Sequence, residues 1–264
     1  MSVPRLSVVI PAVSGEDAAE SCAKSIRRFP GASEVELVVV KARAGTSLLQ
    51  LRAEGVRRAA GPAVAVLGDR YEVTAQWMEA ALRPTEFDAL GGCVSPRPGL
   101  SYFGWCVYLA EYAQLAPPLT DGPTMDPRGL PGGNTVYRRA AVNPERLAEC
   151  ATELLFHAKL IADGASAGRA TALEVVFADP KGALSYVRER FEFSFAIARE
   201  RRQPWRLVLS PILPAAVLAR TAQASWRHRE FFRRWLLCAP VILALGVVQA
   251  AGDLLGHAMA GMSS

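Results

Sequence analysis

Charged side chains follow short apolar runs in this 264-residue sequence, at the points where predicted strands end. Lys41 and Arg43 come after one run, and Asp69 and Arg70 come after the next. In an open parallel sheet, ligands bind in the crevice beyond the carboxyl ends of the strands. The sequence therefore predicts that these basic groups and this carboxylate border a ligand site.

The chain has no glycine-rich loop of the kind that cradles phosphates. The first apolar run ends in Pro11 and Ala12, and the residues that follow, Val13-Ser14-Gly15, complete no GxGxxG pattern. No GxxxxGK(S/T) pattern occurs in the sequence either. A Rossmann dehydrogenase is thereby excluded, and any nucleotide must be held without a glycine cradle.

The first third of the chain alternates between predicted strands and helices. Three β-branched apolar runs predict buried strands at residues 6–10, 35–40 and 63–67. Helices are expected from Asp17 to Phe29 and from Ser47 to Ala60. Strands that alternate with helices at this spacing form right-handed crossovers and a parallel sheet. We therefore predict an α/β fold with a mostly parallel sheet flanked by helices.

The middle of the chain carries a loop, a short strand and a helix. A loop rich in Pro, Gly and Asp ends in Gly132-Gly133-Asn134, and residues 135–137 predict a short strand. A helix is expected from about Glu149 to Asp163, with Gly164 at its C-terminal end. Glu153 and His157 lie one turn apart, so they share one side of this helix.

Composition limits the class of protein. The five cysteines are scattered and show no disulfide or metal-knuckle spacing, which favours a reducing cytoplasm. The N-terminal apolar stretch is short and interrupted by Pro11, so we expect no signal peptide. Arginines crowd between Arg188 and Arg234 around apolar segments. This pattern favours anionic lipid headgroups, with a solvated basic face as the alternative, and we expect no nucleic-acid partner.

The C-terminal part is apolar. Residues 207–219 are too short to cross a bilayer and contain Pro211 and Pro214, whereas Trp235 to Ala251 is nearly uncharged and at the lower limit of a membrane-spanning helix. A buried core helix is the alternative for the second segment. We therefore predict a domain at residues 1–205 and a membrane-associated or re-entrant helical tail at residues 206–264, at the cytoplasmic face of the cell membrane.

The order of these pieces resembles family 2 glycosyltransferases, which have the GT-A fold. The nucleotide-binding half of that family is similar to this chain at Leu6–Val13, Leu51–Gly55, Val66–Asp69 and Trp77. The acceptor half is similar at Gly91-Gly92, Glu111-Tyr112, Gly132-Gly133-Asn134, Tyr137-Arg138-Arg139 and the helix around Glu153. The resemblance covers roughly residues 4–200.

This resemblance implies an inverting, hexosyltransferase-like enzyme of polysaccharide biosynthesis. It would move a sugar from a nucleotide-diphosphate sugar to a saccharide or lipid-linked acceptor. Glu153 occupies the position of the general base, which takes the proton of the acceptor hydroxyl. The acceptor side is expected to include Gly132, Gly133, Asn134 and Arg188. The donor side is expected to include Pro11, Ala12, Lys41, Arg43, Arg52, Asp69 and Arg70.

The acids that hold a metal in that family are partly replaced. The outer positions of its DxD motif fall on Gly68 and Arg70, which leaves Asp69 as the one carboxylate. One carboxylate is a poor site for a hard cation, so no cofactor is assigned, and Mg or Mn at Asp69 stays an alternative. Lys41, Arg43 or Arg70 would instead neutralise the diphosphate. The alternative function is a non-catalytic pseudo-glycosyltransferase that scaffolds a membrane-bound glycan assembly.

Overall fold

The computed structural model describes residues 3–178, 182–201, 209–226 and 229–262. These residues form two compact units. The first unit comprises Met1–Ser95 and Leu115–Ala178, and the second comprises Pro96–Gln114 and Asp179–Ser264. The boundary expected between residues 205 and 206 lies outside the described residues, and the helix that precedes it groups with the second unit.

The first unit is built on a mixed sheet with the strand order β2-β1-β3-β7-β5-β8-β4. β1 runs parallel to β2 and β3, whereas β7 is antiparallel to β3 and β5. The short β6 and β4 both pair with β8 in antiparallel fashion. The strands are β1 (Leu6–Ala12), β2 (Val35–Lys41), β3 (Ala63–Leu67), β4 (Tyr71–Val73), β5 (Ala89–Pro96), β6 (Gly122–Pro123), β7 (Asn134–Arg138) and β8 (Ala167–Phe177).

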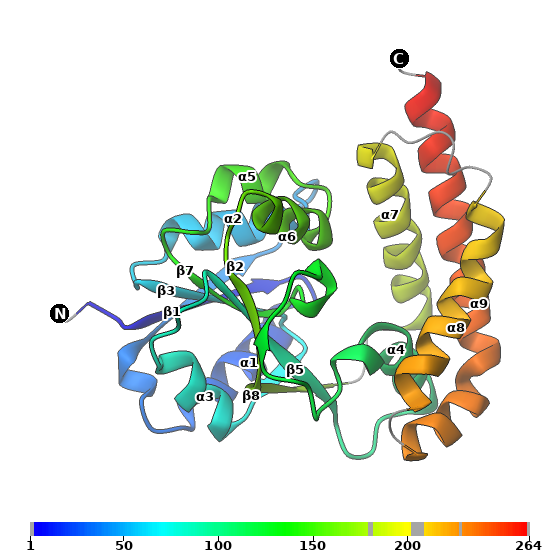
Figure 1. The fold of residues 1–264 in the computed structure, drawn as a ribbon. Helices are drawn as coiled ribbons and strands as arrows, with labels where there is room; N and C mark the ends of the chain where they lie inside the picture. The colour runs from blue at the N-terminus through cyan, green and yellow to red at the C-terminus, as the bar shows by residue number, and fades with distance from the viewer. Residues whose placement is uncertain (1–2, 179–181, 202–208, 227–228, 263–264) are drawn as a thin grey trace. The chain divides into compact units, whose positions relative to one another are not determined.

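Helices cover both faces of this sheet (Figure 1). α1 (Glu16–Arg27) and α3 (Ala75–Leu82) lie on one face, and α2 (Leu48–Arg58), α5 (Pro144–Glu149) and α6 (Glu153–Ala162) lie on the other. Short 3-10 helices occupy Ala32–Glu34, Ala113–Leu115 and Pro127–Gly129. The α/β sheet flanked by helices that the sequence predicts is confirmed. The sheet brings the carboxyl ends of β1, β2 and β3 to one edge, because these three strands are parallel.

One helix boundary differs from the prediction. The helix expected from about Glu149 begins at Glu153, because the side chain of Thr152 accepts a hydrogen bond from the Leu155 backbone N–H and caps α6, whereas Glu149 ends the preceding α5. Asn143 caps α5 in the same way, through the Arg146 backbone N–H. Glu153 is therefore the first residue of α6, where the helix dipole favours a negative charge.

The second unit contains only helices among its described residues, apart from the end of β5. They are α4 (Tyr102–Glu111), the start of the 3-10 helix Ala113–Leu115, α7 (Ala183–Arg201), the 3-10 helix Ser210–Ile212, α8 (Leu213–Trp226) and α9 (Arg229–Met262). Glu111 of α4 accepts hydrogen bonds from Arg190 at 2.7 and 2.8 Å and from the Tyr186 hydroxyl at 2.5 Å, which fastens α4 to α7. Trp235 to Ala251, the apolar segment of the sequence, is the middle of the 34-residue α9.

α9 is long and apolar enough to cross a membrane, on length and composition alone. The stretch Arg229–Met259 reaches a mean hydropathy of 2.0 within an 18-residue window, and 28% of that window is buried. A core helix of a soluble protein can meet the same criteria, but such a helix is mostly buried. Fewer than half of the residues in that window are buried, so α9 is not a fully enclosed core helix in the described part of the chain.

Candidate active site

The Gly132-Gly133 turn contacts both the C-terminal end of β3 and the N-terminal end of α6. The Gly68 N–H donates a hydrogen bond of 2.9 Å to the Gly133 carbonyl. A Cβ atom on Gly133 would lie 2.8 Å from the Tyr71 ring, and one on Gly132 would overlap the Glu153 carboxylate. Both positions therefore require glycine for a close approach, not for an unusual backbone angle.

Asn134 anchors this turn from inside the protein. It is fully buried, and its side-chain oxygen accepts a hydrogen bond of 2.8 Å from the Trp77 indole N–H. Its amide nitrogen donates to the Cys93 carbonyl at 3.0 Å and to the Leu173 carbonyl at 2.7 Å. Since these contacts use both amide N–H groups and the oxygen, Asn134 fixes the position of the turn.

Glu153 and Arg52 form a buried ion pair. Arg52 Nη1 contacts Glu153 Oε1, with the arginine side chain 5% and the glutamate side chain 16% exposed. Burial raises the pKa of the Glu153 carboxyl above its ordinary value, and the Arg52 charge opposes that rise. Arg52 Nε has no hydrogen-bond partner among the described residues. The Glu153 carboxylate therefore lies against Gly132, and the Arg52 Nε–H beside it is a hydrogen-bond donor with no partner among the described residues.

His157 lies one turn beyond Glu153 on α6 and is also buried. Its Nε2 is 2.6 Å from the Tyr137 hydroxyl. Burial, with a smaller contribution from the Arg52 charge, lowers the pKa of His157 from 6.5 to about 3. A neutral imidazole accepts the hydrogen bond of the Tyr137 hydroxyl, so His157 supports α6 against β7 and adds no charge near Glu153.

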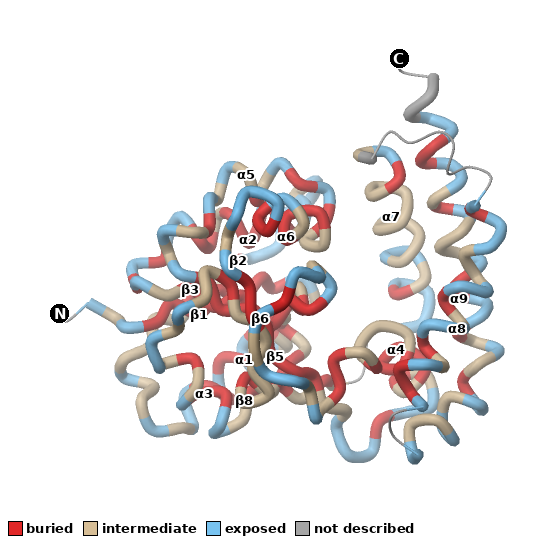
Figure 2. The backbone as a smooth tube through the Cα atoms, in the orientation of Figure 1, coloured by how far each residue is buried: buried red, intermediate tan, exposed pale blue. Residues whose placement is uncertain are grey.

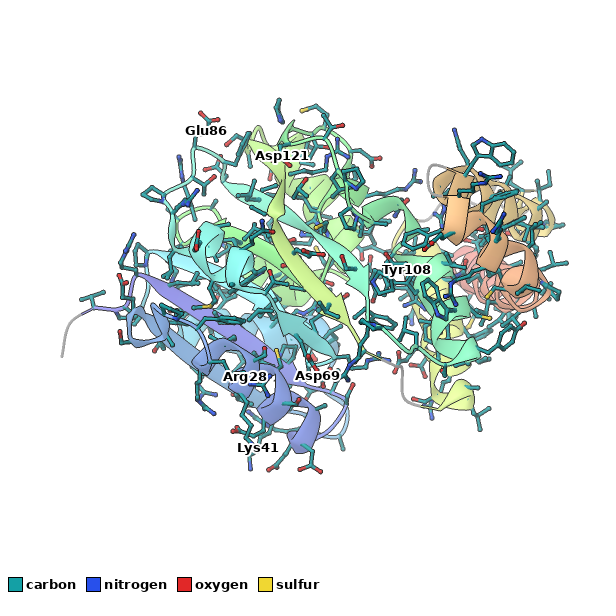
Figure 3. All side chains as sticks on the ribbon, turned by 90° about the horizontal axis from the view of Figure 1, so that it is seen from below. Arg28, Lys41, Asp69, Glu86, Tyr108 and Asp121 are labelled. Carbon is teal, nitrogen blue, oxygen red and sulfur yellow. The ribbon has the colours of Figure 1, made fainter. Side chains whose placement is uncertain are left out.

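Asp69 follows β3 and is buried; its side chain is labelled in Figure 3. Its Oδ2 accepts a hydrogen bond from the Ser14 backbone N–H, which joins the residues that follow β1 and β3. The described residues contain no group of three or more His, Cys, Asp or Glu side chains placed to hold a metal ion. With one carboxylate, one oxygen of which already accepts a backbone hydrogen bond, this turn does not fit a divalent cation held by protein ligands.

The remaining donor-side residues lie around the same edge of the sheet. Ala12 pairs with Lys41 in the register of β1 and β2, so the predicted Pro11, Ala12 and Lys41 share one edge. Lys41 pairs with Glu16 at 2.9 Å, at the exposed surface. The predicted Arg43 is also exposed and donates to both carboxylate oxygens of Glu54 at 2.7 Å. Arg70 is half-buried, and its carbonyl accepts from the Ala178 N–H at 3.1 Å.

Arg188 belongs to the second unit. It lies on α7, where its exposed guanidinium pairs with Glu192 at 2.7 Å. Among the predicted site residues of the first unit, Glu153, Arg52 and Gly132 form one cluster. Asp69 is next in sequence to Gly68, whose N–H donates to the Gly133 carbonyl.

Three partners in this site were not anticipated from the sequence. Arg52 was expected at the donor, and its contact with Glu153 joins α2 to α6. Ser14 was not assigned to the site, and Tyr137 was named only within the acceptor-half resemblance; their contacts with Asp69 and His157 were not expected. No local pattern identifies such pairs, because each joins residues that are distant in the sequence.

No protein-family model and no curated protein matches this sequence. Solved structures of glycosyltransferases are similar to it in fold. The mannosyltransferase PcManGT from Pyrobaculum calidifontis, in complex with GDP-Man and Mn2+, is 16% identical, with a TM-score of 0.54 over 96% of this chain and 88% of that one. TarS 1–349 from S. aureus, in complex with UDP-GlcNAc, is 13% identical, with a TM-score of 0.53 over 97% and 92%. The chain therefore has a glycosyltransferase fold.

Proposed function

We propose that this chain transfers a sugar from a nucleotide-sugar donor to an acceptor hydroxyl, with Glu153 as the general base. The observation that carries the proposal is the Glu153 carboxylate, which begins α6, is paired with Arg52 and lies against Gly132. The fold supports the same class of reaction, since PcManGT is named as a mannosyltransferase with GDP-Man and TarS is in complex with UDP-GlcNAc.

The proposed transfer is a single inverting displacement of a hexosyl group. The acceptor oxygen attacks the anomeric carbon, and the bond from that carbon to the diphosphate oxygen breaks on the opposite face. The hydroxyl proton passes to Glu153, and the nucleoside diphosphate leaves with the bonding electrons. Arg52 favours the ionised form of Glu153, because its charge opposes the rise in the carboxyl pKa that burial causes. We further propose that the Arg52 Nε–H, which has no hydrogen-bond partner among the described residues, donates to an acceptor oxygen.

The donor is proposed to lie at the carboxyl ends of β1, β2 and β3. Asp69 and the loop after Ala12 are joined by the hydrogen bond from Ser14. Lys41, Arg43 and Arg70 supply positive charge along this edge, and cations of this kind stabilise a leaving diphosphate. Because the donor set around Asp69 does not fit a metal, these three residues are proposed to take over that neutralising role.

The proposed acceptor is a saccharide or a lipid-linked saccharide of polysaccharide synthesis. Gly132, Gly133 and Asn134 would shape its site, since the two glycines allow a sugar ring to approach the backbone. An acceptor carried on a lipid would place the reaction at a membrane, for which the apolar α9 is a supporting feature, and we propose the cytoplasmic face.

The test is a survey of ligand-induced stabilisation. A ligand that binds only the folded chain raises its melting temperature. We expect one class of nucleoside diphosphates and the corresponding nucleotide sugars to do so, and we expect Asp69→Asn to weaken the effect. This variant keeps an oxygen for the Ser14 N–H but loses the charge. Glu20→Gln, an exposed carboxylate paired with Arg27 at 2.8 Å, is the matched control. No stabilisation by any nucleotide would contradict the proposed donor class.

A further inference from the structure

The outward side of α9 is a continuous apolar surface. Its exposed side chains recur at spacings of three, four and seven residues, which places them on one side of the helix. Leu237 is 71% exposed, Val247 55% and Met259 50%. We define the α9 stripe as Leu236, Leu237, Leu243, Ala244, Val247, Ala251, Leu254, Leu255, Ala258 and Met259. At 1.5 Å per residue it is roughly 35 Å long.

The polar residues of this stretch lie on the opposite side of α9, where other helices cover them. Asp253 accepts a hydrogen bond of 2.6 Å from the Ser210 hydroxyl, and His257 is buried. A Cβ on Gly252 would lie 2.5 Å from the Phe191 carbonyl of α7, and one on Gly246 would lie 2.9 Å from Pro214. α7 and the start of α8 therefore pack against the inner side of α9, while the residues of the stripe are exposed. Exposed and buried segments alternate along α9 in Figure 2.

The N-terminal end of the stripe is basic and aromatic. Arg229 and Arg233 are exposed seven and three residues before Leu236, so they continue the same side of the helix. Trp226, at the end of α8, is 70% exposed and packs edge-on against Phe232 with ring centroids 4.4 Å apart. Tryptophan and arginine beside an apolar surface are typical of the membrane–water interface, where headgroups meet acyl chains.

The charges of α7 decide how such a surface can meet a bilayer. α7 exposes Arg188, Glu189, Glu192 and Arg199, and it runs alongside the C-terminal half of α9. If α9 crossed the bilayer in this arrangement, α7 would carry these charges into the hydrocarbon, which is strongly unfavourable. If α9 lies flat, the stripe enters the acyl boundary while α7 stays in the headgroup layer or in water.

We infer that the α8–α9 hairpin docks in the plane of an anionic lipid surface, with the α9 stripe facing the acyl chains and Arg229 and Arg233 at the headgroups. This inference refines the membrane location given under the proposed function, but it rests only on the second unit. An in-plane helix of this kind binds through its buried apolar area together with attraction to anionic lipids.

The first test measures flotation of the full chain with vesicles of phosphatidylcholine, with and without phosphatidylserine. We expect stronger binding to the anionic vesicles, weakened by salt. The double variant Leu237→Asp with Val247→Asp should lose more than about tenfold in affinity, because two side chains no longer enter the apolar layer. Leu184→Asp on α7, which is 84% exposed and off the stripe, is the matched control and should bind as the native chain does.

A second double variant tests the basic residues and leaves the α9 stripe unchanged. Arg229→Gln with Arg233→Gln should reduce binding to anionic vesicles and leave the weaker binding to neutral vesicles unchanged. Equal binding to both kinds of vesicle, or equal binding by the stripe variant and its control, would overturn the inference. Dimerisation of the chain through the α9 stripe in the absence of lipid would also overturn the inference. It would be seen as a concentration-dependent sedimentation coefficient that Leu237→Asp abolishes.

Depth measurements separate an in-plane helix from a crossing one. Nitroxide labels on Val247→Cys and on Met259→Cys would report on exposed sites, since the five native cysteines are buried. The in-plane helix predicts similar shallow depths for both labels, whereas a crossing helix places position 247 near the bilayer centre and position 259 near the far surface. Nucleotide-induced shifts in melting temperature, measured on the same variants, distinguish failure of lipid docking from failure of the proposed function. A variant that loses lipid binding but keeps the shift affects docking alone, and a variant that keeps lipid binding but loses the shift affects donor binding alone.

Discussion

The carboxylate of Glu153 and the guanidinium of Arg52 form a buried ion pair that lies against Gly132. This contact joins the first turn of α6 to α2 and gives Glu153 a fixed position and a partner that favours its charged form. A general base needs both properties, since it must lie within reach of the acceptor hydroxyl and be free of its own proton at the working pH.

Replacement of Arg52 should move the pH dependence of transfer. Only the carboxylate form of Glu153 accepts a proton, so the rate rises as pH rises through the folded-state pKa. Arg52→Gln removes the charge that lowers this pKa, and the acidic limb of kcat/KM should move to higher pH. Arg52→Lys, which keeps the charge, should move the limb less. An acidic limb at the same pH in all three proteins would show that Arg52 does not set the charge of Glu153.

The same pair should contribute to stability. Removal of one partner leaves a buried charge uncompensated, which typically costs about 3–5 kcal/mol. We therefore expect Arg52→Gln to lower the free energy of unfolding by that order, and the double variant Arg52→Gln with Glu153→Gln to lose less than the sum of the single losses. Urea denaturation of the three variants measures this coupling, and strict additivity would contradict a direct interaction.

His157 should make the fold sensitive to acid. Its pKa is lowered from 6.5 to about 3 in the folded chain, so the unfolded chain binds a proton first as pH falls. The stability that His157 contributes is complete above about pH 6.5 and is lost as pH falls from there toward about 3. The loss is roughly 3–5 kcal/mol over that window. His157→Gln keeps an acceptor for the Tyr137 hydroxyl and cannot titrate, so its unfolding free energy should fall less with acid.

Gly132→Ala should damage the site through one added methyl group. The new Cβ would overlap the Glu153 carboxylate, which must move away from the turn. We expect a loss of about 1–3 kcal/mol in stability, as for other overpacked sites, together with reduced transfer. Gly182→Ala is the control, because a Cβ there meets no atom within 4 Å. Native activity in Gly132→Ala would mean that Glu153 needs no close approach to this turn.

Donor binding should not depend on a divalent cation. Asp69 is a single carboxylate that already accepts a hydrogen bond from Ser14, and Lys41, Arg43 and Arg70 are the groups proposed to neutralise the diphosphate. The melting shift caused by a nucleoside diphosphate should therefore be the same in a chelator and in manganese. A shift abolished by the chelator and restored by manganese would identify a metal that these residues help to hold.

The sequence predicted the elements whose apolar pattern is local. The runs at residues 6–10, 35–40 and 63–67 are the cores of β1, β2 and β3, and the helices between them begin and end within three residues of the predicted positions. β8 was not predicted, because its eleven residues Ala167–Phe177 are only partly buried and include charged side chains. α9 extends beyond the apolar segment at both ends, since arginines and glycines continue a helix that packing supports.

Site residues were predictable one at a time, but their contacts were not. Glu153 was identified from the resemblance to family 2 glycosyltransferases, and Asp69 from its place after a strand. The pairs that define their chemistry, Arg52 with Glu153 and Ser14 with Asp69, depend on how α2, α6 and the β1 end meet in the folded chain. These contacts depend on the strand order of the sheet and on the position of the Gly132-Gly133 turn in the folded chain. Neither can be read from the local sequence.

The most direct test of the central claim is the single-turnover rate of sugar transfer by Glu153→Gln, measured with donor affinity on the same protein. Glutamine keeps the size of the side chain but cannot take the acceptor proton. The rate should fall by on the order of 10²–10⁴, while donor affinity stays native. Glu149→Gln, an exposed position at the end of α5, should transfer at the native rate. A native single-turnover rate in Glu153→Gln would contradict the assignment of this residue as the base.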